Sequence, residues 1–99
     1  MKITLLRSAR RTVADGISFY ERQGTGLGTY FLTSIMSDIR SLSVYAGVHQ
    51  KYHSYYRMLC SRFPYSIYYR MEGVEAKVYA VLDDRRDPAS IKEMLRDEK

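Results

Sequence analysis

The segment Arg62-Phe63-Pro64-Tyr65-Ser66-Ile67-Tyr68-Tyr69-Arg70 decides the fold that this sequence predicts. It is rich in aromatic residues, and a second run with β-forming residues, Glu75–Leu82, follows after Glu72-Gly73. A two-residue turn at Glu72-Gly73 would join Tyr65–Met71 to Glu75–Leu82 as a β-hairpin. The sequence therefore predicts a sheet in the C-terminal half of the chain.

The predicted turn fixes which side chains share a face of the hairpin. A slip of one residue would exchange the two faces, so the alternation itself specifies the register. The apolar face is expected to support a helical layer, and Arg70 is expected to pair with Glu75 on the other face. The turn places Tyr69 opposite Ala76, Ile67 opposite Val78 and Tyr65 opposite Ala80, and it gathers Ser66, Tyr68, Arg70, Glu75, Lys77 and Tyr79 on the opposite face.

The segments before the hairpin predict one short strand and two helices. Ile3 and Leu5 alternate with polar residues, which indicates a strand. Ser8 is expected to cap a first helix that runs to about Gln23, and Gly16 inside it predicts a close contact with a neighbouring element. The apolar stripe of the first helix is Ala9, Val13, Ile17 and Tyr20; a second helix, from about Leu27 to Ser43, carries Phe31, Ile35, Ile39 and Leu42 on one face.

The remaining segments complete an α+β fold. Residues Val44–Lys51 are expected to form a loop, Tyr55–Arg62 a strand, and Ala89–Arg96 a helix that begins after Pro88. Helices that precede an antiparallel sheet predict two layers, in the order β-α-α-β-β-β(-α), with a helical hairpin packed on the sheet. The 99 residues are expected to form one domain, 1–99.

Composition narrows the class of partner. Sixteen Lys and Arg against eleven Asp and Glu give a net charge of +5 and a pI near 9.4, which favours nucleic acid or an acidic protein segment. One cysteine, Cys60, excludes an internal disulfide and a multi-cysteine metal site. No run approaches the roughly 20 apolar residues of a membrane span. A cytoplasmic location is expected.

This order of elements and its motifs resemble the ParE/RelE superfamily of type II toxin–antitoxin toxins. The resemblance covers nearly the whole chain, and within the superfamily it is closer to the ParE branch of plasmid stabilisation proteins. Many ParE-like sequences carry a histidine where Asp83 stands here. The matching pieces are Ala9 with Phe19-Tyr20-Glu21, Gly26-Leu27-Gly28, Arg62-Phe63-Pro64-Tyr65 with Ile67 and Tyr69, and Arg85-Arg86-Asp87-Pro88.

The resemblance implies a small cytoplasmic toxin that an antitoxin neutralises by wrapping a C-terminal segment around it. ParE relatives poison DNA gyrase, whereas RelE relatives cut messenger RNA on the ribosome. A toxin–antitoxin hetero-oligomer is therefore expected, with gyrase as the target, or the ribosome and mRNA as the alternative. No membrane partner and no cofactor are implied.

Guanidinium groups are the candidate target-binding groups, because they offer paired donors to phosphates and carboxylates. Tyr68 and Tyr79 are expected on the face away from the helices, where an antitoxin segment could cover them, while Tyr65 and Tyr69 are expected in the core. The alternative for each arginine is a solvated surface with local ion pairs. The candidate target-binding residues are Arg57, Arg62, Tyr68, Arg70, Arg85 and Arg86.

Catalysis and metal binding are the less favoured interpretations. RNA cleavage needs an acid and a base near the cations, and the C-terminal tail from Ala89 to Lys99 contains neither tyrosine nor histidine. His49 and His53 are four residues apart but lack a third ligand, and Cys60 is expected to be a buried structural thiol. No catalytic residue is therefore assigned. An mRNA interferase of the RelE type and a non-toxic basic nucleic-acid-binding module remain alternatives.

Overall fold

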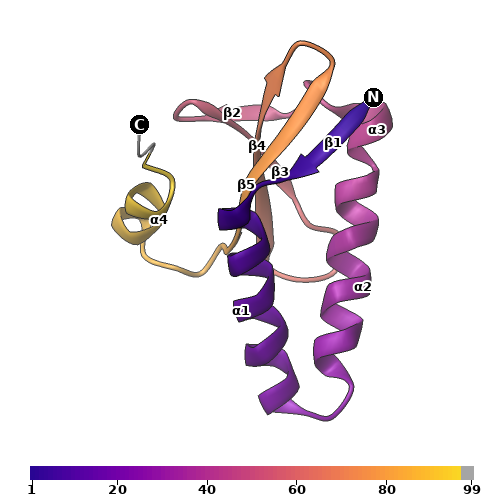
Figure 1. The fold of residues 1–99 in the computed structure, drawn as a ribbon. Coiled ribbons are helices and arrows are strands. Elements are labelled where there is room, and N and C mark those ends of the chain that lie inside the picture. The colour runs from indigo at the N-terminus through magenta and orange to yellow at the C-terminus, as the bar shows by residue number, and fades with distance from the viewer. Residues whose placement is uncertain (97–99) are drawn as a thin grey trace.

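The computed structural model describes residues 1–96, in which two helices pack on one face of a mixed sheet and a third helix packs on the other (Figure 1). The sheet order is β1-β5-β4-β3-β2, with β1 parallel to β5 and every other neighbouring pair antiparallel. The fold class predicted from the sequence is confirmed. The elements are β1 (Lys2–Leu5), α1 (Arg7–Gln23), α2 (Leu27–Arg40), α3 (Leu42–Tyr45), β2 (Gln50–Tyr52), β3 (Tyr55–Leu59), β4 (Tyr65–Glu72), β5 (Glu75–Asp83) and α4 (Pro88–Met94).

The middle of the chain is more ordered than the sequence predicts. The helix expected to end at Ser43 is broken at Ser41, whose hydroxyl donates to the Asp38 carbonyl at 2.6 Å and so competes with the backbone for that acceptor. The prediction of a loop at Val44–Lys51 was wrong at both ends, because α3 includes its first residues and β2, which pairs with β3, includes its last. Conversely, β3 ends at Leu59, before the predicted Arg62.

The predicted turn of the central hairpin was wrong by one position. Glu72 lies opposite Glu75, so the two turn residues are Gly73 and Val74, and Gly73 has a φ of 64° that favours glycine. The register near the turn consequently shifts by two residues from the predicted one. Because the shift is even, the predicted division of faces survives there, and Tyr69 faces Val78 on the helical side.

A β-bulge changes the second half of the hairpin. The register shifts between Tyr68 and Tyr69, so that Tyr68 lies opposite Ala80 while Tyr69 lies opposite Val78. Ala80 therefore joins Tyr68 on the face away from α1 and α2, contrary to its predicted place, and Val81 takes the helical side. The bulge explains why strict alternation fails beyond Val78.

Each face of the sheet carries its own core. The helical side buries Phe31, Ile35 and Val78, each fully. On the other side, α4 covers the sheet, and Tyr68, expected to be exposed, is only 1% exposed. The apolar strip of α4 thus packs on its own sheet through Ile91 and Leu95; the smaller core consists of Tyr55, Tyr68, Ala80, Leu82, Ile91 and Leu95.

Two hydroxyl groups of α1 bind the β5 edge at the bulge. The last hydrogen bond between β1 and β5 runs from the Leu6 N–H to the Val78 carbonyl, so beyond it β5 has no neighbouring strand on that side. The Thr12 hydroxyl accepts from the Val81 N–H at 2.9 Å, and the Ser8 hydroxyl donates to the Tyr79 carbonyl at 2.6 Å. Ser8 therefore lies inside the helix and is not its predicted cap, which is Leu6.

The two long helices approach closely at two glycines. A Cβ atom at Gly16 would lie 2.5 Å from the Phe31 ring, which confirms the close contact predicted at this position. At the tip of the hairpin, the Glu21 carboxylate accepts from the Gly28 N–H at 2.9 Å and from the Gly26 N–H. These backbone donors lower the pKa of Glu21.

Replacing Gly16 with alanine tests this contact, because two effects oppose one another. Helix propensity alone would favour Gly16→Ala by about 1 kcal/mol. The buried Phe31 ring cannot withdraw from a methyl group at 2.5 Å, so we expect a net loss of about 1–3 kcal/mol in the free energy of unfolding, measured in urea. Gly24→Ala is the control, since its nearest neighbour is the movable Leu27 side chain; a stabilised Gly16→Ala variant would contradict the packing described.

Replacing Thr12 with valine tests the bond to the bulge. Thr12→Val keeps the volume but leaves the buried Val81 N–H without an acceptor, so we expect a loss of about 1–3 kcal/mol in stability. Thr12→Ser retains the hydroxyl and is expected to lose less. Hydrogen exchange of the Val81 amide should accelerate in the valine variant alone, and equal behaviour of the two variants would speak against this bond.

Candidate functional site

Three of the candidate arginines meet at one end of the sheet. Tyr65 pairs with Asp83, and the Asp84 N–H donates to the Pro64 carbonyl at 2.8 Å. This pairing brings the β3–β4 loop, with Arg62, beside the segment after β5, with Arg85 and Arg86. The motifs that the sequence separates by more than twenty residues are thus neighbours in space.

These three arginines differ in the partners that their guanidinium groups bind. The Arg85 guanidinium forms a bidentate pair with Asp83, with N–O distances of 3.0 and 2.8 Å, and this pairing lowers the pKa of the Asp83 carboxyl. Arg86 donates to the Ser90 hydroxyl at 3.1 Å, a neutral partner. Within residues 1–96, Arg62 has no side-chain partner and is exposed. Neither Arg62 nor Arg86 forms an ion pair within residues 1–96, although Asp83 lies in the same pocket as Arg86.

Arg57 approaches this end from the face that α4 partly covers. Its Nε donates to the Ser66 hydroxyl at 3.2 Å, and its Nη2 lies 3.4 Å from Asp84. Ser66 in turn donates to the same Asp84 oxygen at 2.6 Å. The two acidic residues that distinguish this segment, Asp83 and Asp84, therefore each bind one of the candidate arginines.

Arg70 and Tyr68 belong to the α4 side of the sheet. The Arg70 guanidinium lies 4.3 Å from the Tyr55 ring centroid and 4.9 Å from that of Tyr79, and it donates to Ser54 at 2.8 Å. The predicted pair with Glu75 was wrong, because the corrected register places Arg70 opposite Lys77. Tyr68 is buried here, so a target could reach it only if α4 moved away.

A cluster of aromatic rings surrounds the Arg62 end. Phe63 lies 4.8 Å from Tyr20, 5.3 Å from Tyr30 and 5.0 Å from Phe31, measured between ring centroids. Tyr30 is 49% exposed and Phe19 is 39% exposed. We call the exposed part of this region the aromatic–arginine end; it consists of Phe19, Arg22, Tyr30, Arg62, Phe63 and Arg86.

A small pocket opens within the aromatic–arginine end. It has a volume of about 260 Å³ and lies between α1 and the end of β5, with Phe19, Arg22 and Arg86 in its lining. Burial raises the pKa of Tyr65, which also lines it, to about 12, so this hydroxyl stays protonated at neutral pH. Arg22, Phe19 and Tyr30 were missed as site residues, since only the tertiary packing brings the helix tips to the loops.

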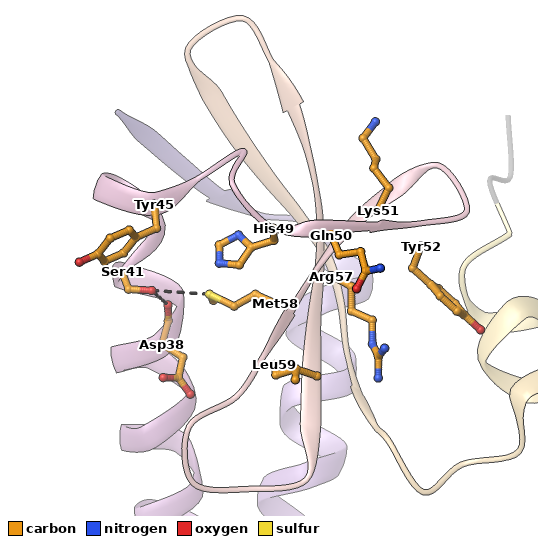
Figure 2. Close-up of a pocket in the computed structure, with 10 residues that line it drawn as sticks. All are labelled: Asp38, Ser41, Tyr45, His49, Gln50, Lys51, Tyr52, Arg57, Met58 and Leu59. Carbon is orange, nitrogen blue, oxygen red and sulfur yellow. Dashed lines mark hydrogen bonds between the residues drawn. The ribbon is translucent and has the colours of Figure 1, made fainter.

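A larger open groove follows the edge of the sheet where β2 stops and β3 continues (Figure 2). Its volume is about 680 Å³, and its lining includes Tyr45, His49, Arg57, Met58 and Leu59. In Figure 2, Tyr45 and Ser41 lie on the helical side of the groove, while Arg57 and Tyr52 lie on the opposite side. Leu59 is 64% exposed, which gives the groove an accessible apolar margin.

A buried hydroxyl fixes the chain segment above this groove. The Tyr69 hydroxyl accepts from the Gly47 N–H at 2.9 Å and also contacts Nδ1 of His49. Because its oxygen already accepts from Gly47, the Tyr69 hydroxyl donates its proton to Nδ1 of a neutral imidazole that carries its own proton at Nε2. Desolvation lowers the pKa of His49, in agreement with this arrangement.

Cys60 and the possible metal ligands of residues 1–96 do not form an activated or metal-binding group. Burial raises the pKa of the Cys60 thiol well above its ordinary value, so it is not a poised nucleophile. Residues 1–96 contain no cluster of three or more His, Cys, Asp and Glu with the arrangement of a metal site. Among the helices of this part of the chain, none is long and apolar enough to cross a membrane.

Comparison with known proteins finds a likeness in fold but none in sequence. No family model matches the sequence, and no characterised protein matches it either. The fold does match a protein chain of the chromosomal ParDE toxin–antitoxin (TA) system from P. aeruginosa, with a TM-score of 0.68 and 16% identity. The match covers 82% of this chain and 92% of that chain. At this identity the likeness concerns the fold, and at that level it confirms the predicted ParE/RelE-like architecture.

The contact between His49 and Tyr69 predicts a dependence of stability on pH. The unfolded imidazole binds a proton near pH 6.5, whereas the folded one does so only at lower pH. Unfolding therefore takes up a proton below about pH 6.5, and the free energy of unfolding should fall as the pH falls through this window. Urea denaturation between pH 5 and about pH 8 should show this decline in the wild-type protein and a smaller one in His49→Gln; parallel curves would contradict it.

Proposed function

We propose that this protein is the toxin of a type II toxin–antitoxin system, ParE-like, and that it acts by binding DNA gyrase. The observation that carries the proposal is the whole-fold likeness to a chain of a ParDE system, which spans most of both chains. The ParE-like motifs that the sequence contains add support. A cognate antitoxin would neutralise the protein in the cytoplasm as a hetero-oligomer.

The aromatic–arginine end is the proposed target surface. Aromatic side chains and arginine dominate the energetics of protein interfaces, and here exposed Tyr30 and Phe19 lie with Arg62 and Arg86 on the same end of the molecule. The net charge of +5 favours an acidic partner. Of the residues predicted from the sequence, Arg62 and Arg86 belong to this end, and Arg85 lies beside them in its pair with Asp83. Arg57 approaches from the α4 side through Asp84, and Tyr68 and Arg70 lie on that side of the sheet.

Binding without catalysis agrees with the groups near these arginines. General acid–base cleavage of RNA needs a group that gains and loses a proton near neutral pH. Tyr65, with a pKa of about 12, does not meet this requirement. His49 contacts Tyr69 beside β2, away from the loops of Arg62 and Arg86. The alternative, an mRNA interferase of the RelE type, is therefore ranked second.

Expression of the chain alone tests the toxin proposal. Induction should arrest growth, and co-expression of the protein encoded by the neighbouring gene should restore it. Supercoiling by purified gyrase should be inhibited by the purified protein at the same time. Unchanged growth under both conditions would remove the proposal, and arrest with new messenger 5′ ends but normal supercoiling would establish the interferase instead.

Charge reversal at the aromatic–arginine end tests the target surface. We expect Arg62→Glu with Arg86→Glu to weaken gyrase inhibition by at least about tenfold, because two charged contacts would become repulsive. Arg40→Glu is the matched control, since Arg40 is an exposed arginine at the other end of α2. Thermal unfolding of each variant confirms that it folds. Equal losses in the double variant and in the control would show that general charge, and not this surface, matters.

A further inference from the structure

The pair of Asp83 and Arg85 borders the aromatic–arginine end. Asp83 is the last residue of β5, and it lines the same small pocket as Phe19 and Arg86. Arg85 follows two residues later, and Tyr20 of the aromatic cluster interacts with its guanidinium. A carboxylate of the protein itself therefore lies among the cations that the sequence assigned to a partner.

Asp83 binds Arg85 through both of its carboxylate oxygens. The Nε of Arg85 donates to Oδ1 at 3.0 Å and its Nη2 donates to Oδ2 at 2.8 Å. Arginine makes this same fork with carboxylates at protein interfaces. The Arg85 side chain is 61% exposed, so a partner can reach it. The internal carboxylate thus fills the position that an aspartate or glutamate of a partner would take.

Displacement from the guanidinium would leave Asp83 with other stabilising contacts. Its Oδ1 also accepts from the backbone N–H of Arg85 at 2.9 Å. The Arg85 side chain, and to a smaller extent the charge of Arg86, lower the pKa of the Asp83 carboxyl, so it stays ionised at neutral pH. Because exposed ion pairs contribute little net free energy, a second carboxylate can replace the first at Arg85.

The neighbouring Asp84 belongs instead to the framework of the sheet. Its Oδ1 accepts from the hydroxyl of Ser66, which is fully buried, at 2.6 Å. Its backbone N–H donates to the Pro64 carbonyl at 2.8 Å. Loss of the Asp84 carboxylate would leave a buried hydroxyl without its acceptor, which proteins rarely tolerate. Within residues 1–96, by contrast, the hydrogen bonds of the Asp83 side chain all come from Arg85.

We propose that Asp83 is an internal competitor for Arg85: its carboxylate occupies the guanidinium in the free protein, and a carboxylate of the target displaces it on binding. This inference rests on the proposed function, because it adds Arg85 to the target surface. Asp83 repels an acidic partner that does not offer Arg85 a replacement carboxylate, so it raises selectivity while it lowers affinity.

Two variants with the same change in charge test the competition. Asp83→Asn keeps the shape and an acceptor for the Arg85 N–H, but it loses the charge that binds the guanidinium. We expect it to bind purified gyrase about three- to fivefold more tightly in surface plasmon resonance, and Arg85→Ala in the same chain should abolish the gain. Glu72→Gln is the matched control and should bind like the wild type, since it frees Lys77 at the far end of the hairpin.

Chemical modification tests the internal pair without any target. Phenylglyoxal attacks an unprotonated guanidine, and pairing with Asp83 raises the pKa of Arg85. Peptide mass spectrometry after brief treatment should show Arg85 reacting more slowly than the exposed Arg62 in the wild type. Its rate should rise in Asp83→Asn and stay unchanged in Glu72→Gln. Asp83→Ser, which also retains an acceptor, is the second variant, and thermal unfolding of each variant shows that it is folded.

The outcomes separate this proposal from the proposed function. Equal modification of Arg85 with and without the Asp83 carboxylate would overturn the internal competition, whatever the target is. Wild-type binding to gyrase that Asp83→Asn and Asp83→Ser leave unchanged would overturn it as well. A wild-type protein that does not bind gyrase, with Arg85 protected only when Asp83 is present, would count against the proposed target and in favour of the pair.

Discussion

The β-bulge at Tyr79 of β5, opposite Tyr68 and Tyr69 and fixed by Thr12 of α1, is the constraint on which the rest of the structure depends. The bulge turns Ala80 and Leu82 toward α4 and Val81 toward the long helices, so it creates two cores from one hairpin. Without a partner for the Val81 N–H, this geometry would leave a buried donor unpaired, which proteins rarely tolerate. The Thr12 hydroxyl supplies that partner. The packing of α1 on the sheet and the shifted register of β5 therefore depend on the same hydrogen bond.

The same register determines where charge accumulates. Pairing of Tyr65 with Asp83 brings the loops of Arg62 and Arg86 together, and it also places Asp83 and Asp84 where they bind Arg85 and Arg57. Of the five arginines that the sequence grouped, two are therefore matched by acids and one, Arg70, lies over aromatic rings. Arg62 and Arg86 form no ion pair within residues 1–96, although Asp83 lines the same pocket as Arg86 and feels its charge.

The sequence predicted the elements well because hydrophobic periodicity reports local geometry. It located β4 and β5, both long helices and the close contact at Gly16, each of which leaves a pattern within a few residues. It could not place the bulge, because no local signal specifies a register shift whose hydroxyl partner, Thr12, is about seventy residues away. Ala80 was assigned to the wrong face for that reason. Tyr68 was placed on the correct face but expected to be exposed, because the sequence did not show that α4 covers it. The three-residue β2 was missed because pairing with β3, and not its own composition, makes it a strand.

The candidate site was predicted less completely, since surfaces are assembled from distant segments. The motif Arg62-Phe63-Pro64-Tyr65 identified one end of the molecule, but Arg22 and Tyr30 reach it only through the helical hairpin. Phe19 and Arg22 line the same pocket as Arg86 because α1 packs on β5 and passes the end of that strand. No pattern within either segment reports that packing, so the sequence could not assign the two helical residues to the site.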